Sequence, residues 1–132
     1  MTGYLKDEEA WKDIQAWTEA AGAVRALCNN RMGILGHYYC GMLDVYTDIT
    51  KQSAVFGTHF EMLEMCELKK YRDSVTFEEV EEKIREFGEA FDIVPECEPA
   101  EIERAARTSI ALDRIIKHHN LSSMAYYYEG EG

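Results

Sequence analysis

The chain has 132 residues, of which 46% are apolar, a length and composition that suit one domain with its own hydrophobic core. Its formal net charge of −11 argues against a nucleic acid or an anionic membrane as partner, because both attract proteins rich in Lys and Arg. No apolar run approaches the roughly 18 residues of a membrane span, and the acidic sequence MTGYLKDEEAW is unlike a signal peptide, so we expect a cytoplasmic protein.

A long amphipathic helix is predicted near the start of the chain. Asp7 is a suitable N-cap, and the acidic residues that follow it favour a helical first turn. Apolar residues then recur at spacings of three and four on one face of this helix, at Trp11, Ile14, Trp17, Ala21, Val24 and Cys28. Two tryptophans on one face need a large surface to pack against.

We expect a single domain over residues 1–132, with a leading helix in residues 1–30 and an α/β core in residues 31–132.

Three short segments of the core are predicted to be strands, with helices between them. Apolar and aromatic residues indicate strands at 31–36, 58–63 and 123–128. Helices are expected at 44–56, which Gly57 would close, and at 64–72.

A capping box gives the clearest helix signal. In the sequence TFEE, the hydroxyl of Thr76 can accept from the backbone N–H of Glu79, whose side chain reaches back. Apolar residues with helical spacing follow, at Phe77, Val80, Ile84, Phe87 and Phe91. Thr76 to Glu103 contains 11 acids and two basic residues, which we interpret as a solvated helix face with Glu79–Lys83 and Glu81–Arg85 ion pairs.

The last predicted helix begins near Pro99, a residue that suits a helical first turn, and ends at Asn120. The basic residues Lys117, His118 and His119 complement the helix dipole at its C-terminus. Its buried face is predicted to contain Ile102, Ala105, Ala106, Ser109, Leu112, Asp113 and Ile116.

Strands that alternate with helices predict a three-layer, Rossmann-like α/β domain with a small, mainly parallel sheet flanked by helices. Three strands are few for such a sheet, because a parallel sheet must be covered on both faces. We therefore expect the chain to be a domain of a larger protein.

The sequence MGILGHYYCGMLDVYTD, at residues 32–48, predicts a binding site. A buried strand ends here at Gly36, and a loop with aromatic and polar residues follows. Open α/β sheets bind ligands beyond the carboxyl ends of their strands. Tyr128, nearest the carboxyl end of the last strand, is the best candidate to line the same crevice. The loop has no phosphate-binding fingerprint.

Two patterns that resemble metal sites are interpreted more simply. Adjacent helical residues point about 100° apart, so we interpret His118 and His119 as charges at a helix end. His59 and Glu61 share one face of a strand and could hold a divalent metal, but two ligands do not make a site. We interpret this pair as an edge or interface contact.

Four cysteines occur in the chain, without a CxxC pair: Cys28, Cys40, Cys66 and Cys97. We expect reduced thiols that pack as small hydrophobic residues. Cys40 would be a nucleophile if His37 lowered its pKa, but no motif supplies a third group to orient the pair. We interpret Cys40 as a loop thiol.

Three collinear blocks resemble the central domain of L-arabinose isomerases and their relatives in the L-fucose/L-arabinose isomerase superfamily. They are GILGHYYCGMLDVYTDIT, FGTHFEMLEMCEL and AARTSIALDRIIKHHNLSSMAYYYEG, and the resemblance runs from about Trp11 to the C-terminus. It implies a cytoplasmic, oligomeric isomerase of carbohydrate metabolism, as in arabinose catabolism. Such enzymes use Mn²⁺ to interconvert an aldose and a ketose, such as L-arabinose and L-ribulose, through an enediol.

The resemblance implies that this chain borders the sugar site but contains no metal ligand and no catalytic residue. The family's metal ligands, two glutamates and two histidines, lie downstream of the last block, so no metal ligand and no catalytic residue is expected here. Met42 resembles a methionine that borders the sugar site, and Tyr128 falls where the family has an aromatic residue. His37, in the same loop as Met42, is expected to affect which sugar fits.

On this interpretation the chain is inactive alone and binds no metal. It lines one side of the sugar site and packs against the remaining domains and other copies. One alternative is a stand-alone sugar-binding or regulatory module without catalysis. Another is an interaction scaffold built on the helix of Trp11 and Trp17.

Overall fold

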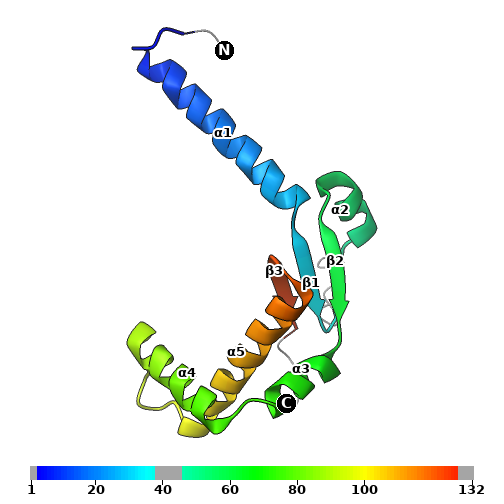
Figure 1. The fold of residues 1–132 in the computed structure, drawn as a ribbon, viewed down its shortest axis with the longest axis vertical. Helices are drawn as coiled ribbons and strands as arrows, with labels where there is room; N and C mark the ends of the chain where they lie inside the picture. The colour runs from blue at the N-terminus through cyan, green and yellow to red at the C-terminus, as the bar shows by residue number, and fades with distance from the viewer. Residues whose placement is uncertain (1–2, 38–45, 128–132) are drawn as a thin grey trace.

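A computed structural model describes residues 3–37 and 46–127 of the chain (Figure 1). The elements follow in the order α1 (Glu8–Cys28), β1 (Arg31–Leu35), α2 (Ile49–Phe56), β2 (His59–Leu63), α3 (Met65–Asp73), α4 (Phe77–Ala90), α5 (Pro99–His119) and β3 (Ser123–Tyr126).

The three strands form one parallel sheet in the order β2-β1-β3, which confirms the predicted α/β class. Leu35, at the end of β1, is in register with Leu63 of β2 and Tyr126 of β3. The chain moves from β1 to β2 in one direction and from β2 to β3 in the other. With right-handed crossovers, the two connections pass on opposite faces of the sheet. On one of these faces α3 and α5 pack against the strands, and α4 packs on α5.

The main core lies between the sheet and helices α3 and α5. Its buried side chains come from β1, β2 and both helices, at Leu35, Leu63, Leu68, Ala111 and Ile115. Gly33 allows close packing here, because a Cβ at this position would lie 2.5 Å from Cδ1 of Leu121. We call this side the helix-covered face of the sheet.

A smaller core joins α4 to α5. Val75, Val80 and Ala106 are buried there, and Ile84, Phe87 and Ile110 pack around them. The capping box is confirmed, because Thr76 accepts from the N–H of Glu79 and Glu79 accepts from the N–H of Thr76. Phe77 and Phe91, at the two ends of the predicted apolar face of α4, are exposed.

The predicted buried face of α5 is partly wrong. Ala106 is buried as expected, but Ala105 and Asp113 are exposed, and the side chains buried further along are Ala111 and Ile115. The reason is that α5 packs on α4 near its start and on the sheet and α3 further along. A single amphipathic face cannot describe a helix that has two different partners.

The helix boundaries follow the capping residues. The carboxylate of Asp7 accepts from the backbone N–H groups of Glu9 and Ala10, so α1 begins as predicted. Helix α2 begins only at Ile49, because Asp48 is its N-cap and accepts from the N–H of Lys51. Residues 46–48 are therefore not helical, although a helix was predicted from residue 44.

The thiols pack less than predicted. Cys28 and Cys66 are exposed, Cys97 is half-buried, and all three are free. The prediction of buried thiols is wrong for Cys28 because the face of α1 that carries it has no buried residue. Cys40 lies outside the described residues.

The predicted ion pairs of α4 are replaced by pairs with other partners. Glu79 binds the guanidinium of Arg114 on α5, and Lys83 Nζ lies 2.6 Å from a carboxylate oxygen of Glu86. Packing of α4 against α5 brings Arg114 to Glu79. The backbone N–H of Thr76 and the side chain of Arg114 lower the pKa of Glu79 below 4.5, its ordinary value.

This lowered pKa predicts how acid affects stability. A carboxyl whose pKa is lower in the folded than in the unfolded chain adds stability above its unfolded pKa and loses it as the pH falls through the folded pKa. We expect the urea midpoint of the wild type to fall more between about pH 6 and about pH 3 than that of Glu79→Gln. Glu78→Gln, outside the capping box, is the control and should behave as the wild type. Equal acid sensitivity of the wild type and Glu79→Gln would contradict the prediction.

Candidate functional site

Two aromatic side chains meet at the carboxyl edge of the sheet. The chain leaves β1 through Gly36, whose φ is +88°, and His37 follows. Directly after the neighbouring strand β3, the N–H of Tyr127 donates to the carbonyl oxygen of Leu35 at 3.0 Å. The rings of His37 and Tyr127 lie against each other, with centroids 4.2 Å apart and planes inclined by 33°.

The ring pair of His37 and Tyr127 lies where the strand order predicts a ligand-binding crevice. The order β2-β1-β3 places the two crossovers on opposite faces of the sheet. In doubly wound sheets, ligands bind outside the carboxyl ends of the strands, where the winding direction changes. His37 and Tyr127 follow the adjacent strands β1 and β3, so they lie where such a crevice forms.

The predicted site residues are described only in part. His37 lies at the expected edge, while Met42 and Tyr128 lie outside the described residues. The structure adds Tyr127, which directly follows the last residue of β3. The last strand was predicted to extend to residue 128, whereas β3 ends at Tyr126. No signal in the sequence indicated this strand end.

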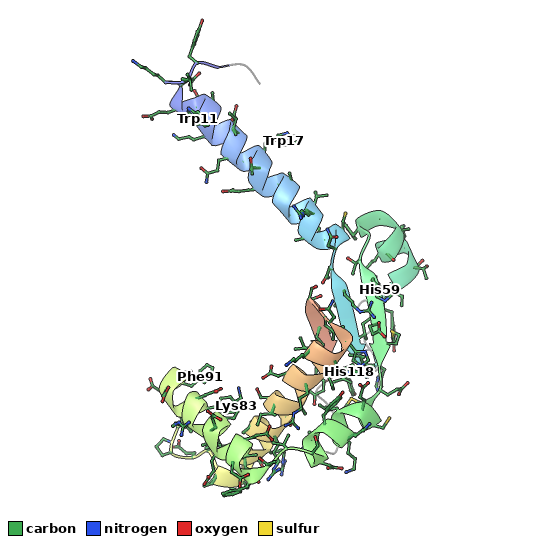
Figure 2. The ribbon with its side chains drawn as sticks, in the orientation of Figure 1. Trp11, Trp17, His59, Lys83, Phe91 and His118 are labelled. Carbon is green, nitrogen blue, oxygen red and sulfur yellow. The ribbon has the colours of Figure 1, made fainter. Side chains whose placement is uncertain are left out.

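A second group of polar side chains lies beside the edge strand β2, and we call it the polar cluster. It consists of Arg31, His59, Glu61, Glu67, His118 and His119. Figure 2 shows two of its members, His59 and His118, on different elements of the fold. Glu61 points to the helix-covered face, since it is two residues from the buried Leu63.

Glu61 is held from two sides within this cluster. One of its carboxylate oxygens binds the guanidinium of Arg31 and lies 3.4 Å from Nε2 of His59. The other lies 3.8 Å from Nδ1 of His119. The predicted His59–Glu61 edge pair is therefore present, but it belongs to a larger group of charges.

Glu67 and His119 connect the start of α3 to the end of α5. Nε2 of His119 lies 2.8 Å from a carboxylate oxygen of Glu67, and both side chains are largely shielded from solvent. The ring of His118 is perpendicular to that of His119, with centroids 4.9 Å apart. One ligand atom from each of Glu67, His118 and His119 lies within 4.8 Å of the other two.

This group of three residues is not evident from the sequence. His118 and His119 were interpreted as helix-end charges because adjacent helical residues point about 100° apart. The acidic partner, Glu67, lies 52 residues before His119, and only the packing of α3 on α5 brings them together. Of all the residues that the structure describes, only these three form such a group.

Helix α1 presents a large apolar surface. It extends away from the sheet and meets the rest of the fold beside α2 (Figure 1). None of its residues is buried, and the side chain of Trp17 is 69% exposed. On the sheet face opposite α3 and α5, Met62 is also exposed. Exposed apolar surfaces of this kind are typical of interfaces.

Comparison with known proteins does not identify a family. No protein-family model matches the chain, and no curated protein matches it. None of the described helices is long and apolar enough to cross a membrane.

Proposed function

We propose that this chain is the central domain of an L-arabinose-isomerase-like enzyme that interconverts an aldose and a ketose. The observation that carries the proposal is the contact between His37 and Tyr127 at the carboxyl edge of β1 and β3. Both residues belong to blocks of sequence that resemble this family. The topology supports a ligand site at this edge on independent grounds.

The chemistry of these two side chains suits a sugar. The ring of a tyrosine offers an apolar face to the C–H groups of a sugar, and its hydroxyl can donate or accept a hydrogen bond. An imidazole can do the same through its two nitrogens. We therefore assign to His37 and Tyr127 the binding and orientation of the substrate. Proton transfer belongs to residues outside this chain.

The isomerases that this sequence resembles use Mn²⁺, but the described residues at the carboxyl edge of the sheet do not form a site for it. Such a metal needs several carboxylate or imidazole ligands that converge. The group of three that the described residues form, Glu67, His118 and His119, comes from α3 and α5 and does not include His37. In this proposal the Mn²⁺ ligands come from the remaining domains, and we derive no step through the metal here.

The exposed apolar surfaces support the second part of the proposal, which concerns assembly. A helix with two exposed tryptophans, and a sheet face on which Met62 is exposed, are typical of surfaces that pack against a partner. We assign these surfaces to packing against the remaining domains of the enzyme and against other copies of it.

The test uses the full-length enzyme with Mn²⁺ and measures conversion of L-arabinose to L-ribulose. Tyr127→Ala is expected to lower kcat/KM about tenfold, mainly through KM, because a substrate contact is lost. Tyr4→Ala is the matched control, since Tyr4 is exposed and far along the chain from the sheet, and it should leave the rate unchanged. The 132-residue chain alone should be inactive. Turnover by that chain, or failure of the full-length protein with every aldose tried, would overturn the proposal.

A stand-alone sugar-binding or regulatory module is the second candidate. It is favoured by an edge that offers aromatic and hydrogen-bonding groups but, among its described residues, no convergent metal ligands. The gene distinguishes the two candidates. A stop codon directly after Gly132 favours the module, while a reading frame that continues to downstream Glu and His ligands favours the isomerase.

A further inference from the structure

We propose that Glu67, His118 and His119 form a binding site for a divalent metal of the zinc class. This inference is independent of the proposed isomerase function, because the resemblance places the Mn²⁺ ligands of that enzyme outside this chain. It concerns a separate site, built by the first turn of α3 and the last turn of α5.

The ligand types favour zinc over harder cations. Two imidazoles and one carboxylate are a common set of protein ligands for Zn²⁺, whereas Ca²⁺ and Mg²⁺ prefer sets made of oxygen atoms. Three protein ligands leave one position of a tetrahedral site for water. The exposure of His118 gives solvent access to that position.

The geometry requires only a small adjustment. Zinc bonds to nitrogen and oxygen are about 2.0–2.2 Å long, so the ligand atoms of a tetrahedral site lie roughly 3.4 Å apart. The three ligand atoms here lie within 4.8 Å of one another, and Nε2 of His119 is already 2.8 Å from Glu67. The side chain of His118 is exposed and can rotate toward the other two.

A metal-binding histidine usually donates the N–H of its other ring nitrogen to a carboxylate or a carbonyl group, and Glu61 is placed to accept from His119. If Nε2 of His119 binds the metal beside Glu67, its Nδ1 carries the proton and faces Glu61 at 3.8 Å. A carboxylate in this place fixes the tautomer and orientation of a ligand histidine. Glu61 is itself held by Arg31, so the orienting group is anchored in the sheet.

The experiment is a calorimetric titration of the metal-free 132-residue chain with ZnCl₂, in a buffer that does not bind zinc. We expect saturable binding of one Zn²⁺ per chain. His118→Ala and Glu67→Gln should each weaken the affinity at least tenfold, because each removes one ligand. Circular dichroism of the metal-free variants shows whether each one folds.

His59→Ala is the matched control. His59 is an exposed histidine of the same polar cluster, 3.4 Å from Glu61, but it is not among the three proposed ligands. It should change the affinity less than threefold. A tenfold loss in His59→Ala with no loss in His118→Ala would overturn the proposal and assign the metal to the His59–Glu61 pair.

Cobalt substitution tests the thiols as competing ligands. Cys66 is exposed and adjacent in sequence to Glu67, so a metal could bind a thiolate instead. Tetrahedral Co²⁺ bound as we propose gives visible d–d absorption without the near-ultraviolet charge-transfer band of a cobalt thiolate. Either that band, or the absence of saturable Zn²⁺ binding by the folded wild-type chain, would overturn the proposal.

Discussion

Ile115→Ala is expected to lower the free energy of unfolding by about 2–5 kcal/mol, the largest effect of any single substitution considered for this chain. Ile115 is fully buried in the main core, where α5 packs against the sheet and α3. Truncation removes three carbons from this contact and leaves a cavity that close-packed neighbours cannot fill. A loss of this size is a large part of the roughly 5–15 kcal/mol that stabilises a typical domain. Urea denaturation monitored by circular dichroism measures it.

Ile14→Ala is the matched control for this prediction. It makes the same chemical change in a helix of the same length, but Ile14 lies on the exposed face of α1. We expect a change within about 0.5 kcal/mol, as for surface substitutions elsewhere. Equal losses in the two variants would show that α1 packs in solution against a surface that the isolated fold does not provide. A small loss in Ile115→Ala would contradict the core described for the sheet and α5.

Local signals predicted much of this fold because their causes are local. Asp7, the capping box at Thr76 and Pro99 each satisfy or remove a backbone N–H at a helix start, and the helices begin where these residues predict. The alternation of strands with helices predicted the parallel sheet for a similar reason. Parallel strands need a crossover connection between them, and the sequence of each such connection has a helical pattern.

Long-range contacts explain what the sequence did not reveal. The partner of Glu79 is Arg114 rather than Lys83, and the partner of His119 is Glu67. Both contacts depend on how α5 packs against α4 and α3, which periodicity does not specify. His37 was found because a strand end followed by a loop is a local pattern. Its contact with Tyr127 depends on the order of the strands.

Gly36→Ala is expected to destabilise the fold by about 2–4 kcal/mol and to disturb the proposed sugar site. Two physical causes add. The φ of Gly36 is +88°, a conformation that costs an L-residue roughly 1–2 kcal/mol. A Cβ at this position would also lie 2.9 Å from Cβ of Tyr127, closer than such atoms approach. Because Cβ is fixed to the backbone, neither atom can rotate away, so the ends of β1 and β3 must separate.

The two causes can be measured separately. Tyr127→Gly removes the Cβ that would be too close, so in that background Gly36→Ala should cost only the conformational part, roughly 1–2 kcal/mol. Gly88→Ala is the control, because Gly88 lies within α4 and nothing lies within 4 Å of a Cβ added there. Alanine in a helix is more stable than glycine, so this variant should be about 0.5–1 kcal/mol more stable than the wild type. If Gly36→Ala were also stabilising, the turn after β1 would not have the left-handed conformation that brings His37 to Tyr127.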